Sequence, residues 1–372
     1  MVGIDADVSS RTVSYIYYTG YESSQANGVQ IIHTTNALHD LGYDIDLITA
    51  GDISAYAADN QLEIRSRTHR CPIAVGRETP DRVSYYSYAL LRSRHADIIF
   101  TRDISFLKFL SVLPWRPSTP IFYEAHQSYS GIDAMSTAEE RQRLRHADIV
   151  ITHSTGIAAD LESMGISVHS VIPNAANEEF LPAAYPSELA TQLGITERTV
   201  TIVYSGSLHE WKNDIELLIE AAATMQDPDV KVVIVGGERQ RIRQLRAFSK
   251  QVGVDPDRIE FVGRVPHRRV FDYLSVADIG VVPLKADHPS ATKYTSPLKL
   301  FEYLLCDLQI VASSVPATAS ITERNIHRYE PGDTDDMRRA LEEAAAADAT
   351  AEAAYTYRWR AGQIHEIFQS EF

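Results

Sequence analysis

The chain has 372 residues, which is too long for one small domain, so two domains with complete hydrophobic cores are expected. Hydrophobic residues make up 44% and charged residues 23%, and this balance excludes a disordered or fibrous chain. The formal net charge of −15 would repel a phosphate backbone, so nucleic acid is not an expected partner.

The cellular location is read from the cysteines and from the apolar runs. Cys71 and Cys306 are the only cysteines, and two thiols so far apart in sequence are more simply read as reduced than as a disulfide. The first twelve residues have no signal-peptide pattern, and no stretch has the roughly 18 apolar residues of a membrane span. A cytoplasmic protein is therefore expected. The excess of acidic residues and the scarcity of lysine fit either adaptation to high salt or a GC-rich genome.

The first half alternates short apolar runs with helical patterns, which is typical of a parallel sheet built from βαβ units. A helix is predicted to open near Gly28 and to stop at Gly42, a favourable C-terminal cap. Strands are predicted at Val13–Tyr18, Ile45–Thr49, Asp97–Thr101, Pro120–Tyr123, Asp148–Thr152 and Val168–Ile172.

The pattern then begins again, so the expected fold class is α/β with two doubly wound, Rossmann-like domains facing a ligand cleft. A Pro-rich stretch places the boundary near residue 180, giving domains 1–180 and 181–350. The aromatic segment 351–372 should form a helix that packs back on a domain, such as the first. Strands of the second domain are predicted at Val200–Tyr204, Lys231–Val235, Ile259–Val262, Ile279–Pro283 and Gln309–Ala312.

The most informative stretch for chemistry is YTSPLKLFEYLLCDLQIVAS, which begins at Tyr294. Ser296 is suited to an N-cap and Pro297 to the first helical position, so a helix 298–305 should present free amides to an anion. Lys299 and Glu302 share one face of this helix, and a solvent-exposed Lys–Glu pair is the alternative reading. A separate apolar stripe is expected from Leu298, Phe301 and Leu305.

A second candidate anion site follows the first strand of the second domain, in YSGSLHEWKND. Gly206 permits a tight turn, and Lys212 precedes Asn213 and Asp214, the candidate caps of the next helix. The ammonium of Lys212 could reach a phosphate there, or it could simply be exposed to solvent.

Two segments of the first half carry weaker signals. Gly28 would let the backbone approach a ligand. In IFYEAHQ, polar residues Glu124, His126 and Gln127 end a predicted strand, where they are placed to face a ligand, although a single histidine at such a position is more often structural. Neither the dinucleotide motif G-x-G-x-x-G nor the P-loop motif follows a predicted strand, which weakens simple dehydrogenase and NTPase interpretations.

Taken in chain order, these segments resemble the GT-B glycosyltransferases of glycosyltransferase family 4. The most specific match is SPLKLFEYLLCDLQIVAS, which is similar to the donor-site helix and following strand of that family. The other matching segments are Gly28–Gln30, Tyr123–Gln127, Val171–Phe180 and Phe261–Val265.

The resemblance implies roles for individual residues. It assigns His126, Lys212 and Glu302 to the catalytic centre, with Glu302 as the ribose ligand. Two family residues are replaced: Ser207 stands where an arginine commonly grips the diphosphate, and Tyr294 stands where a first glutamate is expected. The implied donor-binding set is Gly28, Gly206, Ser207, Arg264, Val265, Tyr294, Thr295, Ser296, Leu298 and Lys299.

The resemblance also implies the reaction, a retaining transfer of a sugar from a nucleoside diphosphate sugar to a glycan, lipid-linked or small-molecule acceptor. No metal and no cofactor are expected. Peripheral membrane contact is left open, and the apolar segment 106–116 is read as a packed helix in preference to an interfacial one. Two alternatives stand: a sugar-nucleotide-binding subunit without catalysis, and an epimerase, for which Glu124 is the one good acid/base candidate.

Overall fold

A computed structural model describes residues 11–18, 26–72, 81–227, 229–352 and 355–372 of the chain. It divides into two compact units. Unit 1 contains the chain up to residue 153, residues 157–173 and residues 357–372, and unit 2 contains residues 154–156 and 174–356. The boundary lies at Pro173, before the expected position near 180, because Phe180 already packs in unit 2, with its ring 5.4 Å from that of His267.

Unit 1 is built on a seven-stranded, fully parallel sheet with the order β3-β2-β1-β4-β5-β6-β7. The order reverses between β1 and β4, so this edge is a topological switch point. The strands are β1 Thr12–Tyr17, β2 Asp44–Thr49, β3 Arg67–Arg70, β4 Ile98–Thr101, β5 Ile121–Ala125, β6 Ile149–Thr152 and β7 Ser170–Val171.

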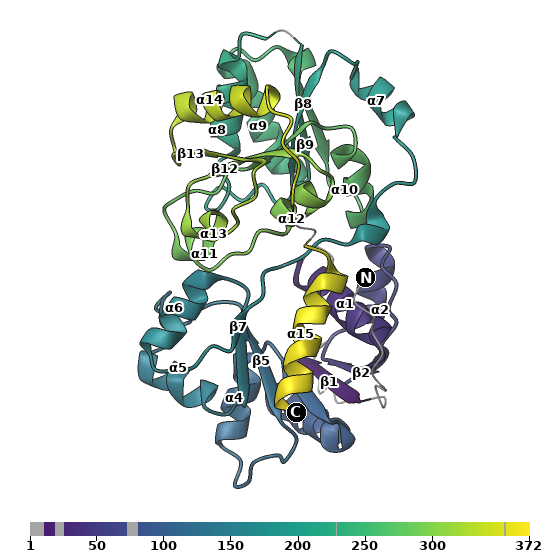
Figure 1. Cartoon of the computed structure of the whole chain (residues 1–372), viewed down its shortest axis with the longest axis vertical. Helices are drawn as coiled ribbons and strands as arrows, with labels where there is room; N and C mark the ends of the chain where they lie inside the picture. Colours follow the sequence, from purple (N-terminus) through teal and green to yellow (C-terminus); the bar gives the residue numbers. More distant parts are fainter. Residues whose placement is uncertain (1–10, 19–25, 73–80, 228, 353–354) are drawn as a thin grey trace. The chain divides into compact units, whose positions relative to one another are not determined.

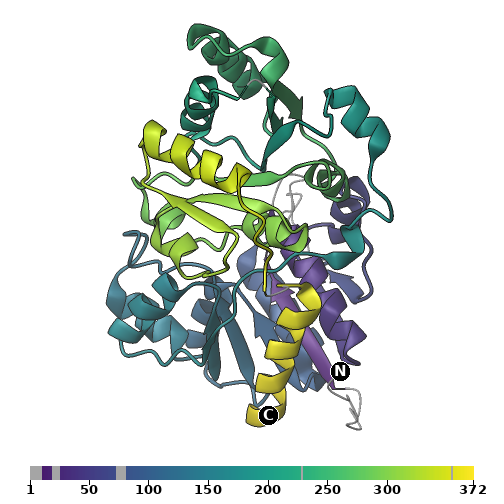
Figure 2. The same cartoon turned by 45° about the horizontal axis from the view of Figure 1, so that its top comes forward.

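The helices of unit 1 come from both ends of the chain. The C-terminal helix α15 lies beside α1 in both views (Figures 1 and 2). Phe368 of α15 is fully buried, with its ring 5.1 Å from that of Phe122 and 5.6 Å from that of Tyr43. The helices are α1 Ala26–Asp40, α2 Ile53–Asp59, α3 Arg82–Arg92, α4 Ile104–Ser111, α5 Thr137–Leu144, α6 Thr155–Ser163 and α15 Tyr357–Glu371.

Unit 2 has a six-stranded parallel sheet with the order β10-β9-β8-β11-β12-β13, which reverses between β8 and β11. Helices α8 and α14 pack together, and their apolar faces help to enclose the core. The strands are β8 Val200–Ser205, β9 Val230–Val235, β10 Ile259–Gly263, β11 Ile279–Val282, β12 Gln309–Ser313 and β13 Ile326–Tyr329. The helices are α7 Ser187–Leu193, α8 Ile215–Thr224, α9 Arg239–Gln251, α10 His267–Leu274, α11 Pro289–Thr292, α12 Leu298–Leu305, α13 Pro316–Ala319 and α14 Thr334–Ala345.

The predicted fold class of two doubly wound α/β domains is confirmed, but two edge strands were not predicted. These are β3 and β13, whose sequences RTHR and IHRY have no apolar run. The packed-helix reading of segment 106–116 holds for α4, which buries Phe106, Leu107 and Leu110. It is wrong for residues 112–116, which lie beyond the helix and expose Val112 and Trp115. None of the helices in the described ranges is long and apolar enough to cross a membrane.

Candidate functional site

The loop that follows β8 is fixed at the switch point of unit 2. The amide of Asp214 donates to the carbonyl of Pro283, just past β11, at 2.7 Å, and the amide of Lys285 donates to the carbonyl of Lys212 at 3.0 Å. The side chain of Asp214 accepts a bond from the amide of Leu217 and caps α8, as predicted. These bonds hold the Lys212 backbone at the carboxyl edge of the sheet, where open α/β sheets bind ligands.

Two glycines allow the loops at this edge to pack backbone against backbone. Gly206 and Gly236 have φ values of 131° and 116°, a conformation that favours glycine. A Cβ on Gly236 would lie 2.1 Å from the carbonyl oxygen of Gly206. A Cβ on Gly206 would in turn lie 3.2 Å from Cε of Lys299, so the Lys299 side chain extends over this loop.

Lys212 and Lys299 are two ammonium groups with only neutral hydrogen-bond partners. Nζ of Lys212 donates to Oγ1 of Thr295 at 3.1 Å. Nζ of Lys299 donates to the hydroxyl of Tyr204 at 2.9 Å and lies 4.0 Å from the centre of the Tyr204 ring. It also donates to Oδ1 of Asn213 at 3.3 Å. Within the described residues, neither lysine has a carboxylate at ion-pair distance.

The electrostatics of the two lysines follow from this environment. Desolvation by burial lowers the pKa of Lys212. Burial, together with the positive charge of Lys212, lowers the pKa of Lys299 to about 7. Two desolvated cations side by side repel each other, and an anion bound between them would relieve that repulsion. Glu302 offsets part of this repulsion at Lys299, but among the described residues neither lysine has an ion-pair partner, so unit 2 contains a basic site suited to an anion.

Glu302 lies one turn along α12 from Lys299 and has an unpredicted partner. Its Oε1 is 2.6 Å from Nε2 of His267, the first residue of α10, and the carboxylate is buried. The ring of Phe180 packs against this histidine. The signal available in the sequence was the position of His267 three residues after Arg264 in FVGRVPH, but nothing there linked it to a residue 35 positions later.

The start of α12 differs from the prediction. Ser296 does not cap the helix, because its Oγ accepts a bond from the amide of Asn174 at 3.0 Å. Its carbonyl accepts from Nδ2 of Asn174 at 2.6 Å, and Pro297 takes the cap position without a side-chain bond. The predicted apolar stripe is also wrong in part: Phe301 is buried, whereas Leu298 and Leu305 are only half-buried. The buried face is made by Leu300, Phe301, Tyr303 and Leu304.

The remaining predicted donor-binding residues of unit 2 differ in how far they are exposed to solvent. Ser207 and Arg264 are exposed and Val265 is half-buried. Tyr294 is buried, and Nζ of Lys293 lies 5.5 Å from the centre of its ring. The carbonyl of Ser207 accepts bonds from the Tyr204 hydroxyl and from Nδ2 of Asn213, so this loop is fixed through its backbone. A donor contact of these residues stays a prediction.

In unit 1, Gly28 lies inside α1, and a Cβ there would be 2.5 Å from ring atoms of Tyr56. Its lack of a side chain is explained by the packing of α1 on α2. The expectation that Gly28 leaves its backbone open to a ligand is wrong on the side where a Cβ would lie, because the Tyr56 ring covers it. Donor binding at Gly28 stays a prediction.

His126 lies at the end of β5, in a cluster of charged and polar side chains. Nη2 of Arg102 donates to its Nδ1 at 2.6 Å, and its Nε2 is 2.9 Å from Oε1 of Glu124. The ring of His153 lies against it at 4.3 Å between centroids. Burial, reinforced by Arg102, lowers the pKa of His126 to about 4, so the ring is neutral near pH 7.

Glu124 is 2% exposed and is ion-paired with Arg360 of α15. Burial alone would raise the pKa of Glu124, but Arg360 and His126 outweigh it and hold the pKa well below its ordinary value. A carboxylate committed in this way does not exchange protons near neutral pH. The epimerase alternative therefore loses its acid/base candidate.

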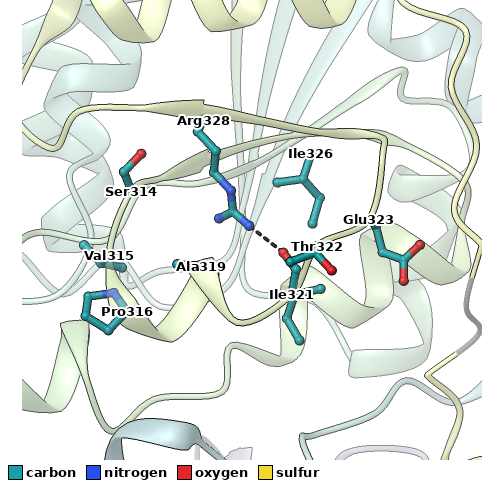
Figure 3. A pocket seen from close by; sticks show the side chains of 9 residues that line it. All are labelled: Ser314, Val315, Pro316, Ala319, Ile321, Thr322, Glu323, Ile326 and Arg328. Atoms are coloured by element: carbon teal, nitrogen blue, oxygen red, sulfur yellow. Dashed lines mark hydrogen bonds between the residues drawn. The ribbon is translucent and has the colours of Figure 1, made fainter.

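A separate cavity of about 500 Å³ lies beside α13 and β13 in unit 2 (Figure 3). Arg328 extends into this region, and its Nη2 donates to the carbonyl of Ile321 at 2.6 Å. None of the predicted site residues lines this cavity. No cluster of three or more metal-ligating side chains is found in the part of the chain that the structure describes.

Two family profiles match the chain, one on each half. The family described as Glycosyltransferase Family 4 matches residues 28–180, and the family described as Glycosyl transferases group 1 matches residues 199–347. A curated relative from Bacillus subtilis (strain 168) bears the name teichuronic acid biosynthesis glycosyltransferase TuaH and is 27% identical over 122 residues. That match covers 33% of this chain and 29% of the relative.

Solved structures resemble the whole chain. Sucrose-phosphate synthase (tll1590) from Thermosynechococcus elongatus has a TM-score of 0.72 at 19% identity, over 96% of this chain and 98% of the other. Anabaena Alr3699/HepE in complex with UDP has a TM-score of 0.74 at 16% identity, over 97% and 100%. Further HepE structures are complexes with UDP and glucose and with UDP-glucose. At these identities the likeness establishes the fold.

Proposed function

Because the chain is a group 1 glycosyltransferase with the GT-B fold, we propose that it transfers a sugar from a nucleoside diphosphate sugar to an acceptor hydroxyl. The observation that carries this proposal is the pair of amino groups of Lys212 and Lys299, whose hydrogen-bond partners are all neutral. A diphosphate is a dianion or more, and it would supply the missing counter-charge. HepE binds UDP and UDP-glucose, so a uridine diphosphate sugar is the first donor to test.

The proposed catalytic step is the departure of the nucleoside diphosphate. Negative charge grows on its phosphate oxygens as the glycosidic bond breaks, and preorganised cations stabilise that charge without reorganising. Lys212 and Lys299 would do this together with the free amides at the start of α12. In this proposal no metal is required, and the departing phosphate accepts the proton of the acceptor hydroxyl during front-side attack, with retention of configuration.

Lys299 takes over the task of the arginine that Ser207 replaces. Its side chain runs over Gly206, the neighbour of Ser207, so its charge stands beside the loop that would otherwise carry the arginine. Glu302 would accept bonds from the ribose diol, held in place by His267. His126 would contact the sugar or order the acceptor, which we propose is a glycan, a lipid-linked sugar or a small molecule.

A binding-only subunit is the second candidate, and it is favoured by the absence of two family residues at Ser207 and Tyr294. Thermal-shift measurements with UDP, GDP, ADP and their sugars test for a donor site, because a ligand of the folded state raises the melting temperature. Donor hydrolysis and transfer to an acceptor library are then measured with and without EDTA. Transfer that survives EDTA supports the enzyme, tight binding without turnover supports the subunit, and loss of turnover restored by a divalent cation contradicts the metal-free mechanism.

A further inference from the structure

Arg360 is a buried charge of unit 1 and is supplied by helix α15. The residue is 1% exposed. Nη2 of its guanidinium pairs with Oε1 of Glu124, Nη1 donates to Oγ1 of Thr34 at 3.3 Å, and Nε donates to the carbonyl of Pro173 at 3.1 Å. All three guanidinium nitrogens are therefore engaged, so the position of Arg360 is strongly determined.

Glu124 connects this arginine to His126. The same carboxylate oxygen that pairs with Arg360 lies 2.9 Å from Nε2 of His126, a close charge contact whose angle does not make it a hydrogen bond. On the other side of the ring, Arg102 must donate to Nδ1, because a guanidinium has no acceptor. A neutral imidazole that accepts at Nδ1 carries its hydrogen on Nε2, so the bond from Arg102 sets the tautomer.

From this chain of contacts we infer that Arg360 is a positioning residue for the proposed glycosyl transfer: by holding Glu124 it fixes the orientation of His126, and its own positive charge favours the neutral ring, whereas Arg102 sets the Nε2–H tautomer. The inference rests on the proposed function only for the use that is made of His126. The arrangement itself depends on unit 1 alone.

Several other groups face the imidazole and enter its charge balance. Arg102 is cationic and buried, His153 packs edge-on against the ring, and Tyr15 of β1 lies close enough to interact electrostatically with Glu124, Arg102 and Arg360. Removing the positive charge of Arg360 should make protonation of His126 easier. Removing the negative charge of Glu124 should make it harder. Opposite shifts of the His126 pKa in the two variants would show that Arg360 and Glu124 act through their charges, because a loss of packing would not reverse its sign between them.

The test uses the full-length protein with ¹⁵N-labelled histidine, and His126→Gln assigns the His126 signals. The ¹⁵N shifts of the imidazole report the tautomer and protonation directly. In wild type the ring should stay neutral, as one tautomer, down to pH 5.5. When the pH is lowered further, the titration should lie higher in Arg360→Met and lower in Glu124→Gln than in wild type, where the pKa of His126 is about 4. Arg360→Lys should restore most of the wild-type spectrum.

A matched control is Arg11→Met, because Arg11 also ties α15 to unit 1, through a 2.9 Å bond from its Nη1 to the carbonyl of Phe368, without contacting Glu124. It should leave the His126 signals unchanged. If Arg360→Met does not fold, Arg360→Met combined with Glu124→Gln removes both charges of the pair, and the His126 signals should still shift away from those of wild type. Unchanged His126 signals in a folded Arg360 variant would overturn the inference.

Turnover separates this inference from the proposed function. For Arg360→Met we expect kcat to fall by about tenfold or more, with a pH profile that follows the new His126 titration. If the ¹⁵N titration moves as described but kcat and its pH profile do not, Arg360 still positions His126, and the role given to His126 in catalysis is wrong. If neither moves, the positioning role is wrong, whatever the activity.

Discussion

Arg360 of unit 1 and Lys299 of unit 2 are both desolvated cations at the carboxyl edge of a parallel sheet, yet they have different surroundings. Arg360 has a carboxylate, a carbonyl and a hydroxyl around its guanidinium. Lys299 has a phenol, an amide oxygen and a second cation nearby. A cation that the fold needs is neutralised inside the fold, whereas a cation kept for a ligand is left without its counter-charge. The same substitution should therefore affect stability at one position and ligand binding at the other.

The largest expected effect is on the stability of unit 1. Arg360→Met leaves the Glu124 carboxylate buried without its partner, and breaking a buried ion pair in this way costs about 3–5 kcal/mol. Denaturant unfolding at pH 7 should show this loss in the free energy of unfolding. Adding Glu124→Gln to the variant should recover most of it. A single variant within about 0.5 kcal/mol of wild type would contradict the assignment of this pair as structural.

Lys212→Ala should have the next largest effect, this time on binding. Its loss removes a charge-assisted bond to the diphosphate, so the binding free energy should weaken by about 1.5–3 kcal/mol. Titration calorimetry with UDP and GDP measures this. The matched control is Lys285→Ala, because the bond of this lysine to the carbonyl of Lys212 is made by its backbone amide and survives the substitution. Wild-type affinity in Lys212→Ala would mean that the donor lies elsewhere.

Lys299→Met should lower turnover and not stability, whereas Arg360→Met lowers stability. Removing a desolvated ammonium that lacks a counter-charge should leave the free energy of unfolding unchanged or raise it. Turnover should fall about tenfold or more, since one of two cations at the leaving group is lost. Adding Ser207→Arg should restore part of kcat, and Lys293→Met serves as the control for a neighbouring lysine. Full activity in Lys299→Met would refute the compensation for Ser207.

Glu302→Gln should have a smaller effect, because glutamine keeps one acceptor oxygen towards His267 and the ribose. We expect donor KM to rise by a factor that corresponds to about 0.5–1.5 kcal/mol, with kcat little changed. His267→Gln should produce a similar change if the histidine acts only by holding the carboxylate. Steady-state kinetics with ribose and 2′-deoxyribose donors measures this. An identical loss with both donors would mean that Glu302 does not read the 2′-hydroxyl.

The smallest expected effect is the uptake of protons when the donor binds. The pKa of Lys299 is lowered to about 7 in the folded chain, so near pH 7.5 much of it is neutral, and a bound diphosphate should raise that pKa. Binding should then take up as much as about three quarters of a proton, measured by calorimetry in buffers of different ionisation enthalpy. Without ligand, the unfolded chain binds more protons than the folded one above pH 7, so this group makes stability rise with pH between 7 and 10. In Lys299→Met, this proton uptake and this contribution to the rise of stability with pH should both be absent.

The comparison also explains what could be read from the sequence. Lys212, Asp214 and helix α12 follow from local spacing, because caps and helix starts are decided within a few residues. The Ser296 cap was wrong because Asn174, 122 positions earlier, occupies its hydroxyl. His267 and Arg360 were missed because their partners lie 35 and 236 positions away, where local periodicity carries no information.

The division of the chain sets the order in which it can be completed on the ribosome. Unit 2 ends by residue 356, so every residue it needs is synthesised before the last helix. Unit 1 begins first but cannot close, because Phe368 and Arg360 fill its interior and appear only in the last sixteen residues, 357–372. Such contacts have a large sequence separation and form slowly. Until residues 357–372 are synthesised, unit 1 must therefore expose the apolar surface that α15 covers, so chains that stop before residue 357 should aggregate through this unit.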